Sequence, residues 1–345
     1  MQVSTASLAD VNAFIANTGK PIERTNALVE GNLTKHKGIC MYLNLTRQSM
    51  KSAALAACAT TLLAAAPLSF AADPKPTPPK HEGMSADEVA KELANPNNDL
   101  AKLSFKNRYT WYDGDLPNAN KQDNYTLLFQ PIFPFGLGHA ANGNKQVLFV
   151  RPAVPLLVEQ PVFNASKRDF DGVTALGDIG FDLAYAETAK DGFLWAAGLV
   201  GSLPTASDSQ VASGQWRFGP EALVGKLYKW GTLAIFPSHL WDVGGWNNEK
   251  GFSQTSIQPI FQYVMGGGWT VGTKGIYVYD WKAKQWSAPI HANVAKTVKL
   301  GSTPWQFELE VNYYAERPDP FAPQWMVSFN VTPVVHNFIE DMFKK

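Results

Sequence analysis

The sequence predicts an all-β protein: a transmembrane, antiparallel up-and-down β-barrel of about twelve strands, preceded by a short N-terminal periplasmic segment. Three observations support this prediction, namely an export signal, recurring period-two alternation, and long polar connections that alternate with short turns. The 345 residues are 45% hydrophobic, 12% aromatic and 17% charged, with a mean hydropathy of -0.17. This composition excludes a bundle of apolar membrane helices, whereas abundant aromatic residues suit the interfacial girdles of a barrel.

A secretory signal peptide is predicted over residues 50–71. It combines a positive start, an apolar stretch over residues 53–66, and the small residues Ser69 and Ala71 at the expected cleavage point. A competing interpretation makes Cys58 the lipidated cysteine of a lipobox, but the sequence after it stays apolar where a lipoprotein turns polar. The protein is therefore expected in the outer membrane of a Gram-negative cell.

Residues 1–49 show neither apolar periodicity nor a processing signature, so we interpret them as an upstream extension that is not part of the native protein. Cys40 and Cys58 both precede the cleavage point, which leaves the mature chain without disulfides or cysteine metal sites. The formal net charge is +0 and no basic run is interleaved with aromatics, so nucleic acid is not an expected partner. We predict no cofactor and no metal.

Residues 72–100 are predicted to form a periplasmic linker and a short helix. The linker over residues 73–80 is proline-rich and therefore extended. Ser85 stands three residues before Glu88, the pattern of a capping box, and the helix should end at Asn95-Pro96. This segment could be an anchor, a small plug or a merely solvated leader.

The barrel is predicted over residues 101–335 because apolar and polar residues alternate there with a period of two. Leu103, Phe105, Tyr109 and Trp111, for example, share one face of the first strand. An even number of strands puts both chain ends on one side of the membrane, as bacterial barrels require. The expected strands are 103–111, 125–135, 147–158, 179–185, 193–199, 215–224, 232–241, 255–265, 269–280, 286–298, 307–313 and 325–331.

The connections between these strands fall into two alternating sets, the pattern of an outer-membrane barrel. Residues 136–144 are an exception, because they form a longish connection on the side of the short turns. The long, mostly polar connections are 112–123, 159–177, 203–214, 242–254, 282–285 and 316–323. The short turns are 187–192, 225–231, 266–268 and 299–304.

A soluble β-sandwich or lipocalin-like barrel would also alternate with a period of two. The length of the strands favours the membrane, since most approach what a tilted strand needs to cross it. Residues 336–345 then form a C-terminal tail. Because many barrels end on an aromatic residue that the insertion machinery reads, a tail ending in Phe343-Lys344-Lys345 is expected to weaken that signal.

The strongest candidates for the lumen are charged residues within the strands, because a charge facing lipid costs roughly 2–4 kcal/mol at the membrane midplane. A twelve-stranded lumen is wide enough for small solutes and narrower than that of a large porin. The alternative is a closed lumen filled by structural salt bridges. The candidates are Lys106, Arg108, Arg151, Asp182, Arg217, Glu221, Glu308 and Glu310.

An enzyme is not predicted. Ser238 and His239 are adjacent, so on a strand they point to opposite faces and cannot pair as nucleophile and base. No G-x-S-x-G motif occurs, and the other histidines lack metal-ligand spacing. An outer-membrane lipid hydrolase therefore remains the weakest alternative, after a structural or adhesive surface protein.

Seven stretches of the mature chain resemble a bacterial outer-membrane channel-like family that is named for the meta pathway of phenol degradation and often labelled simply transporter. The resemblance implies a barrel that moves small molecules, with aromatic or hydrophobic molecules as the candidate solutes. It implies outer-membrane lipid, the insertion machinery and a small solute as partners, and no catalytic residues. The stretches are LANPNNDLAKLSFK (93–106), LLFQPIFPF (127–135), LFVRPAVPLL (148–157), ALGDIGFDLAYA (175–186), GLVGSLPTA (198–206), SHLWDVGG (238–245) and PWQFELEVNYYAERPDPFAPQW (304–325).

Overall fold

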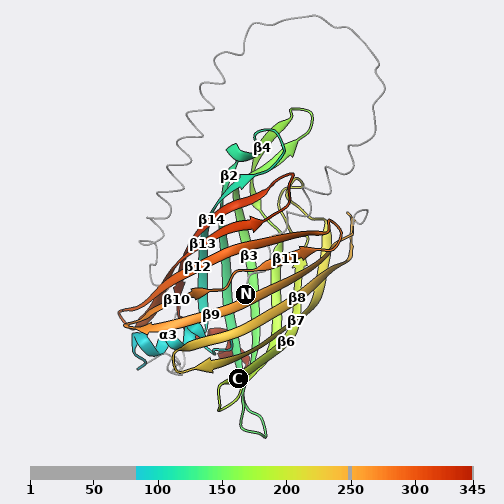
Figure 1. Ribbon diagram of the computed structural model, residues 1–345. Helices are drawn as coiled ribbons and strands as arrows, with labels where there is room; N and C mark the ends of the chain where they lie inside the picture. Colours follow the sequence, from blue (N-terminus) through green and yellow to red (C-terminus); the bar gives the residue numbers. More distant parts are fainter. Residues whose placement is uncertain (1–82, 248–250, 344–345) are drawn as a thin grey trace, which may run out of the picture. The chain divides into compact units, whose positions relative to one another are not determined.

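The computed structural model describes residues 83–247 and 251–343. The predicted upstream extension, the signal peptide and the whole proline-rich linker lie outside these residues. The described chain forms one closed antiparallel sheet of 14 strand segments (Figure 1). Two strands are interrupted, because β4 and β5 both pair with β3, while β10 and β11 both lie between β9 and β12. The segments therefore make a barrel of twelve strands.

The barrel closes without a free edge, which a membrane-spanning sheet requires. The first and last strands pair along their lengths, from Phe105 opposite Val331 to Trp111 opposite Trp325. The strands are β1 (Lys102–Asp113), β2 (Asp123–His139), β3 (Lys145–Asn164), β4 (Asp169–Leu176), β5 (Ile179–Thr188), β6 (Phe193–Leu203), β7 (Gln215–Tyr228), β8 (Gly231–Gly245), β9 (Ser253–Gly266), β10 (Trp269–Thr273), β11 (Tyr277–Asp280), β12 (Gln285–Leu300), β13 (Thr303–Glu316) and β14 (Ala322–Pro333).

The twelve predicted strands are all present, and the prediction of an all-β barrel is confirmed. One predicted connection is wrong: residues 159–177 are mostly a β-hairpin, with a tip at residues 165–168. The polar residues near the tip favoured a loop, but Val162 and Phe163 pair with Asp171 and Phe170 and extend the ladder beyond the neighbouring strands (Figure 1). The two phenyl rings of this hairpin lie 5.2 Å apart, centroid to centroid.

The outer surface carries exposed aromatic residues near both ends of the strands, with exposed aliphatic residues between them. Such paired girdles are typical of barrels in a lipid bilayer, because aromatic rings favour the membrane interfaces. The girdle at the end with the long connections, here the long-loop end, contains Trp111, Trp216, Trp241, Trp281, Trp286 and Trp325. The girdle at the opposite, short-turn end contains Phe193, Tyr228, Tyr263 and Trp269.

The wall is interrupted at residues 274–276, between β10 and β11. The flanking strands carry Pro259 and Pro289 near this point, and neither proline can donate a backbone hydrogen bond to the ladder. Side chains replace the missing partners: Gln258 donates to the Lys274 carbonyl at 2.7 Å, and the Lys274 amide donates to Nδ1 of His291 at 3.1 Å. Thr270, four residues before Lys274, is buried and Trp269 is exposed, so the alternation places the Lys274 side chain on the inner face of the barrel.

Helix α3 (Ala86–Ala94) begins at the predicted capping box. The Ser85 hydroxyl accepts from the Glu88 amide, and the Glu88 carboxylate accepts from the Ser85 amide at 2.7 Å. The side chains of Val89 and Ala90 are buried. A second helix, α4 (Phe338–Phe343), lies in the predicted C-terminal tail. Among the described residues, neither helix is long and apolar enough to span a membrane.

Candidate pore lumen

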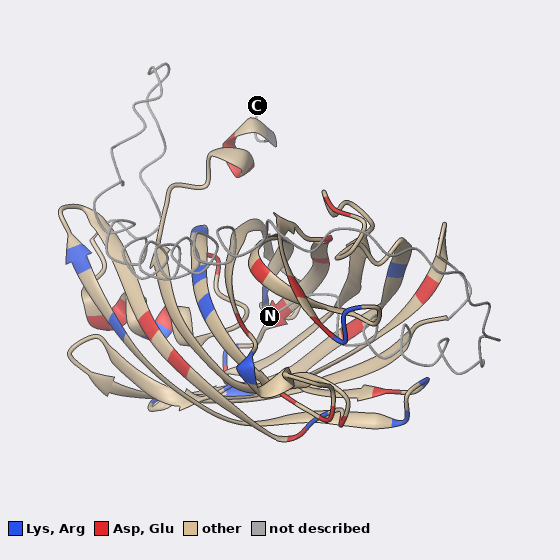
Figure 2. Ribbon diagram, turned by 90° about the horizontal axis from the view of Figure 1, so that it is seen from above, with Lys and Arg blue, Asp and Glu red and all other residues tan. Residues whose placement is uncertain are grey.

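All eight predicted lumen residues lie on the inner face of the wall. Along each strand these charged residues alternate with apolar residues that are exposed on the outer face, so the period of two places the charges inside the barrel. Six of the eight are buried, whereas Lys106 and Arg151 are partly exposed. Figure 2 shows where the acidic and basic positions fall along the strands.

One group of charges lies on β1 and β13, two strands separated by β14. In the register, Arg108 is opposite Ser328, which is in turn opposite Glu310. One step toward the short-turn end, Lys106 is opposite Asn330, which is opposite Glu308. The pairing of the strands thus fixes a polar wall with two basic and two acidic side chains in adjacent rows.

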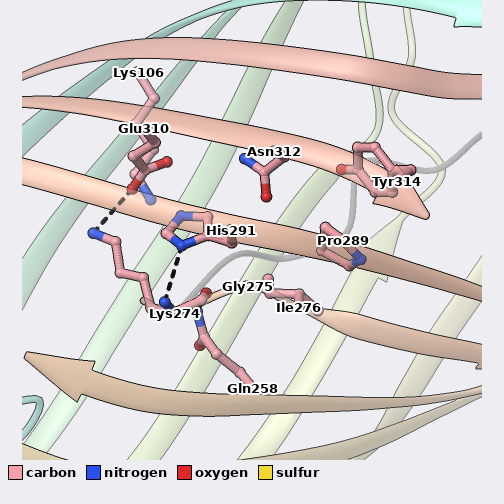
Figure 3. Close-up of a pocket in the computed structure, with 10 residues that line it drawn as sticks. All are labelled: Lys106, Gln258, Lys274, Gly275, Ile276, Pro289, His291, Glu310, Asn312 and Tyr314. Carbon is pink, nitrogen blue, oxygen red and sulfur yellow. Dashed lines mark hydrogen bonds and ion pairs between the residues drawn. The ribbon is translucent and has the colours of Figure 1, made fainter. Parts of the chain in front are cut away.

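Lys274 joins this group from the interruption between β10 and β11 (Figure 3). Its ammonium group lies 2.7 Å from a Glu308 oxygen and 2.9 Å from a Glu310 oxygen. Glu308 also accepts hydrogen bonds from Asn293 at 2.9 Å and from Asn330 at 3.0 Å. Lys274 was missed among the predicted lumen residues, although the period of two that predicts a strand over residues 269–280 also places it on the inner face with the buried Thr270.

A second group of charges lies on β3, β5 and β7. Arg151 forms an ion pair with Asp182 at 2.5 Å. Arg217 donates to the side chain of Gln215 at 3.0 Å, and its guanidinium lies over the Phe252 ring, 3.9 Å from the centroid. Within the described residues, neither carboxylate oxygen of Glu221 has a hydrogen-bond partner. Nε and Nη2 of the buried Arg108 likewise have none, so the described part of the inner wall holds incompletely satisfied charges of both signs.

The remaining inner wall is apolar toward the short-turn end of β3 and β5–β8. Large side chains there pack against one another and are almost fully buried. Toward the short-turn end the inner surface of the barrel is thus divided, with polar and charged residues on β1 and β12–β14 and apolar residues on β3 and β5–β8, whereas the second group of charges lies farther along β3, β5 and β7. The apolar cluster comprises Val147, Phe149, Ala186, Leu194, Ala196, Leu223 and Phe236.

A cavity of about 150 Å³ lies between these walls and is bounded by the segment that follows α3. Lys106, Arg151, Lys274 and Glu308 all line it, so it touches both groups of charges. Its other boundary includes the segment from Leu93 to Asn98. We call residues 84–100 the N-terminal plug, because they close the cavity toward the short-turn end.

Polar contacts hold the plug against four different turns or strand ends. Asp87 accepts from the Gly268 amide, and Lys299 donates to the Met84 carbonyl at 2.7 Å. Asn97 donates to the carbonyls of Glu187 and Trp195 at 3.2 and 3.1 Å. Further contacts are an ion pair between Asp99 and Lys145 at 2.9 Å and an apolar cluster of Val89, Leu100 and Val334.

Glu92 is a partly buried titratable residue of the plug. Burial raises the pKa of its carboxyl above the ordinary value of 4.5, and the positive charge of Lys145 opposes this effect only in part. The protonated form of Glu92 is therefore favoured when the helix is docked.

These features define the class of protein: a twelve-stranded β-barrel with the outer surface of a membrane protein and a divided inner wall. No protein-family model and no curated protein matches the chain. Among solved structures, it is similar to the COG4313 outer membrane channel from Pseudomonas putida F1, with 9% identity and a TM-score of 0.52. This match covers 76% of the chain and 100% of that channel. At such identity the likeness concerns the fold, which is that of an outer-membrane barrel.

A weaker match is outer membrane phospholipase A from Escherichia coli, with 13% identity, a TM-score of 0.36, and coverage of 73% of this chain and 99% of the other. The resemblance to the family named for phenol degradation stays a prediction, because the comparisons support only an outer-membrane channel fold.

Proposed function

We propose that the protein is an outer-membrane channel for small solutes that combine an apolar body with a polar or charged group. The observation that carries this proposal is the divided inner wall, which offers aliphatic and phenyl side chains on one side and Lys, Glu and Asn side chains on the other. A solute of mixed character could contact both the polar wall and the apolar cluster at once, whereas a sugar would find no hydrogen-bond partners among the side chains of the apolar cluster.

The N-terminal plug completes the proposal, because it narrows the path at the short-turn end. We place that end in the periplasm and the long loops outside the cell, as in other bacterial barrels. Outer-membrane lipid surrounds the girdles, and the insertion machinery assembles the barrel. This function requires no covalent chemistry in the lumen.

A structural protein with a closed lumen is the second candidate. The double ion pair of Lys274 with Glu308 and Glu310 favours it, because these side chains are satisfied by one another and leave little charge for a solute. Single-channel recording of refolded protein in planar bilayers separates the two candidates. A channel gives stepwise currents, and Lys106→Glu should shift its permeability ratio toward cations.

The matched control is Lys229→Glu, because Lys229 is exposed in a turn and does not line the cavity. It should leave the ratio unchanged. A silent bilayer with a fully folded barrel, or equal effects of the two variants, would refute the channel. The solute class is tested by vesicle efflux, in which an aromatic carboxylate should leave faster than a sugar of similar mass.

A further inference from the structure

A hydroxyl–imidazole–hydroxyl row lies on the outer face of the barrel, outside the lumen. His239 of β8 is directly opposite Thr255 of β9, and Ser253 lies two residues before Thr255 on the same face, opposite Trp241. Their outward orientation follows from the alternation, because Phe236 and Leu240 of β8 are buried inside while Ile235 and Trp241 are exposed. Ser238, adjacent to His239, belongs to the inner face, where it is opposite Glu221.

The three side chains are connected by hydrogen bonds through both ring nitrogens of the histidine. The Ser253 hydroxyl oxygen lies 3.2 Å from His239 Nε2, and the Thr255 hydroxyl oxygen lies 2.7 Å from His239 Nδ1. The Trp281 indole also donates to Thr255 at 2.8 Å, which fixes the threonine side chain. With the proton on Nδ1 donated to Thr255, Nε2 is free to accept the Ser253 proton, as nucleophile activation requires.

The aromatic girdle at the long-loop end indicates how deep this row lies in the membrane. The His239 ring lies 4.2 Å from that of Trp241, and Trp241 and Trp281 are both exposed members of the girdle. Tryptophan side chains at such positions sit at the level of the lipid headgroups. The ester bonds of a phospholipid join its headgroup to its acyl chains, so they lie near this level.

We propose that Ser253 and His239 form a catalytic pair that hydrolyses acyl esters of membrane lipids, with Thr255 as a positioning residue. Ser253 Oγ attacks the ester carbonyl while its proton passes to His239 Nε2. The tetrahedral intermediate collapses, the glycerol oxygen leaves with that proton as the hydroxyl of a lysolipid, and an acyl-serine remains. Water, deprotonated by His239, then attacks the acyl-serine; the fatty acid is released and the proton returns from His239 to Ser253 Oγ. This activity uses the outer face and is independent of the proposed channel.

Covalent labelling of the unaltered protein tests the nucleophile directly. Refolded protein is treated with a fluorophosphonate that carries an alkyl chain, and the modified residue is identified by mass spectrometry. We expect modification at Ser253 alone among the serines of the outer face. Absence of label at Ser253 in the folded barrel would overturn the proposal.

Fatty-acid release from phosphatidylcholine vesicles tests the reaction. Ser253→Ala and His239→Asn should each lower the rate by about 100-fold or more, the range of general acid–base catalysis. Thr255→Val should lower it and Thr255→Ser should restore it, which a merely structural contact would not produce. Ser238→Ala is the matched control on the inner face and should leave the rate unchanged.

Single-channel conductance of the same variants keeps the two functions separate. Ser253→Ala should conduct like the unaltered protein, which shows that its barrel is intact. Equal hydrolysis by Ser253→Ala and the unaltered protein would refute the catalytic pair, whatever the outcome for the channel.

Discussion

Lys274→Met is the most informative perturbation of the inner wall. The substitution preserves the length of the side chain and removes the charge that two buried carboxylates share, at 2.7 and 2.9 Å. Glu308 retains the amides of Asn293 and Asn330, so the loss falls mainly on Glu310, of which 2% is exposed. Removing one partner of a buried ion pair costs about 3–5 kcal/mol, and the retained amides suggest about 3 kcal/mol here.

The free energy of unfolding is measured by urea titration of the barrel in lipid vesicles, with tryptophan fluorescence as the signal. The control is the double variant Lys274→Met, Glu310→Gln, which removes the cation together with the carboxylate that loses most, keeps the net charge of the group unchanged and should recover most of the loss. A loss below about 1 kcal/mol for the single variant would contradict the reasoning, since it falls to the level of a surface ion pair. Equal losses in the single and double variants would contradict it as well.

Two further predictions concern the N-terminal plug. Asp99→Asn removes the ion pair with Lys145 and should raise the open probability in single-channel recordings, whereas Asp191→Asn, which breaks a comparable exposed pair with Lys226, should not. The raised pKa of Glu92 means that docking of the plug is favoured below its ordinary value of 4.5 and weakens as the pH rises through the raised value. The open probability should therefore increase with pH between 4.5 and the raised pKa of Glu92. Glu92→Gln should abolish this pH dependence. If neither Asp99→Asn nor the change in pH altered the open probability, the plug would not control opening of the channel.

The fold was largely predictable because one period governs the whole wall. Alternation in segments such as residues 103–111 determines which side chains face outward, and an even strand count follows from the alternating connections. The capping box of Ser85 and Glu88 also predicted its helix, since capping depends on neighbouring residues. The hairpin within residues 159–177 was missed, because its pairing depends on partners that only the folded chain brings together.

The candidate sites depend on contacts between strands, which a single sequence does not reveal. Adjacent Ser238 and His239 were correctly assigned to opposite faces, since that follows from the period alone. The partner of His239 is Ser253, and their proximity depends on the register of β8 against β9. Lys274 likewise reaches Glu308 and Glu310 because β10 pairs with β12 and β12 pairs with β13, an arrangement that only the folded chain brings about.

The barrel wall is one strand thick, so neighbouring residues of a strand face different environments: one faces the lipid and the next faces the lumen. On β6, Leu199 is exposed on the outer face, while Val200 belongs to the buried inner apolar cluster with Leu128 and Leu240. A charge at Leu199 would face lipid and oppose insertion, at a cost of roughly 2–4 kcal/mol near the midplane. A charge at Val200 would instead enter the lumen and change what passes through it. Insertion and solute selection can therefore be altered separately within one strand. For the same reason, the outer face can hold the proposed Ser253–His239 pair without any change to the lumen.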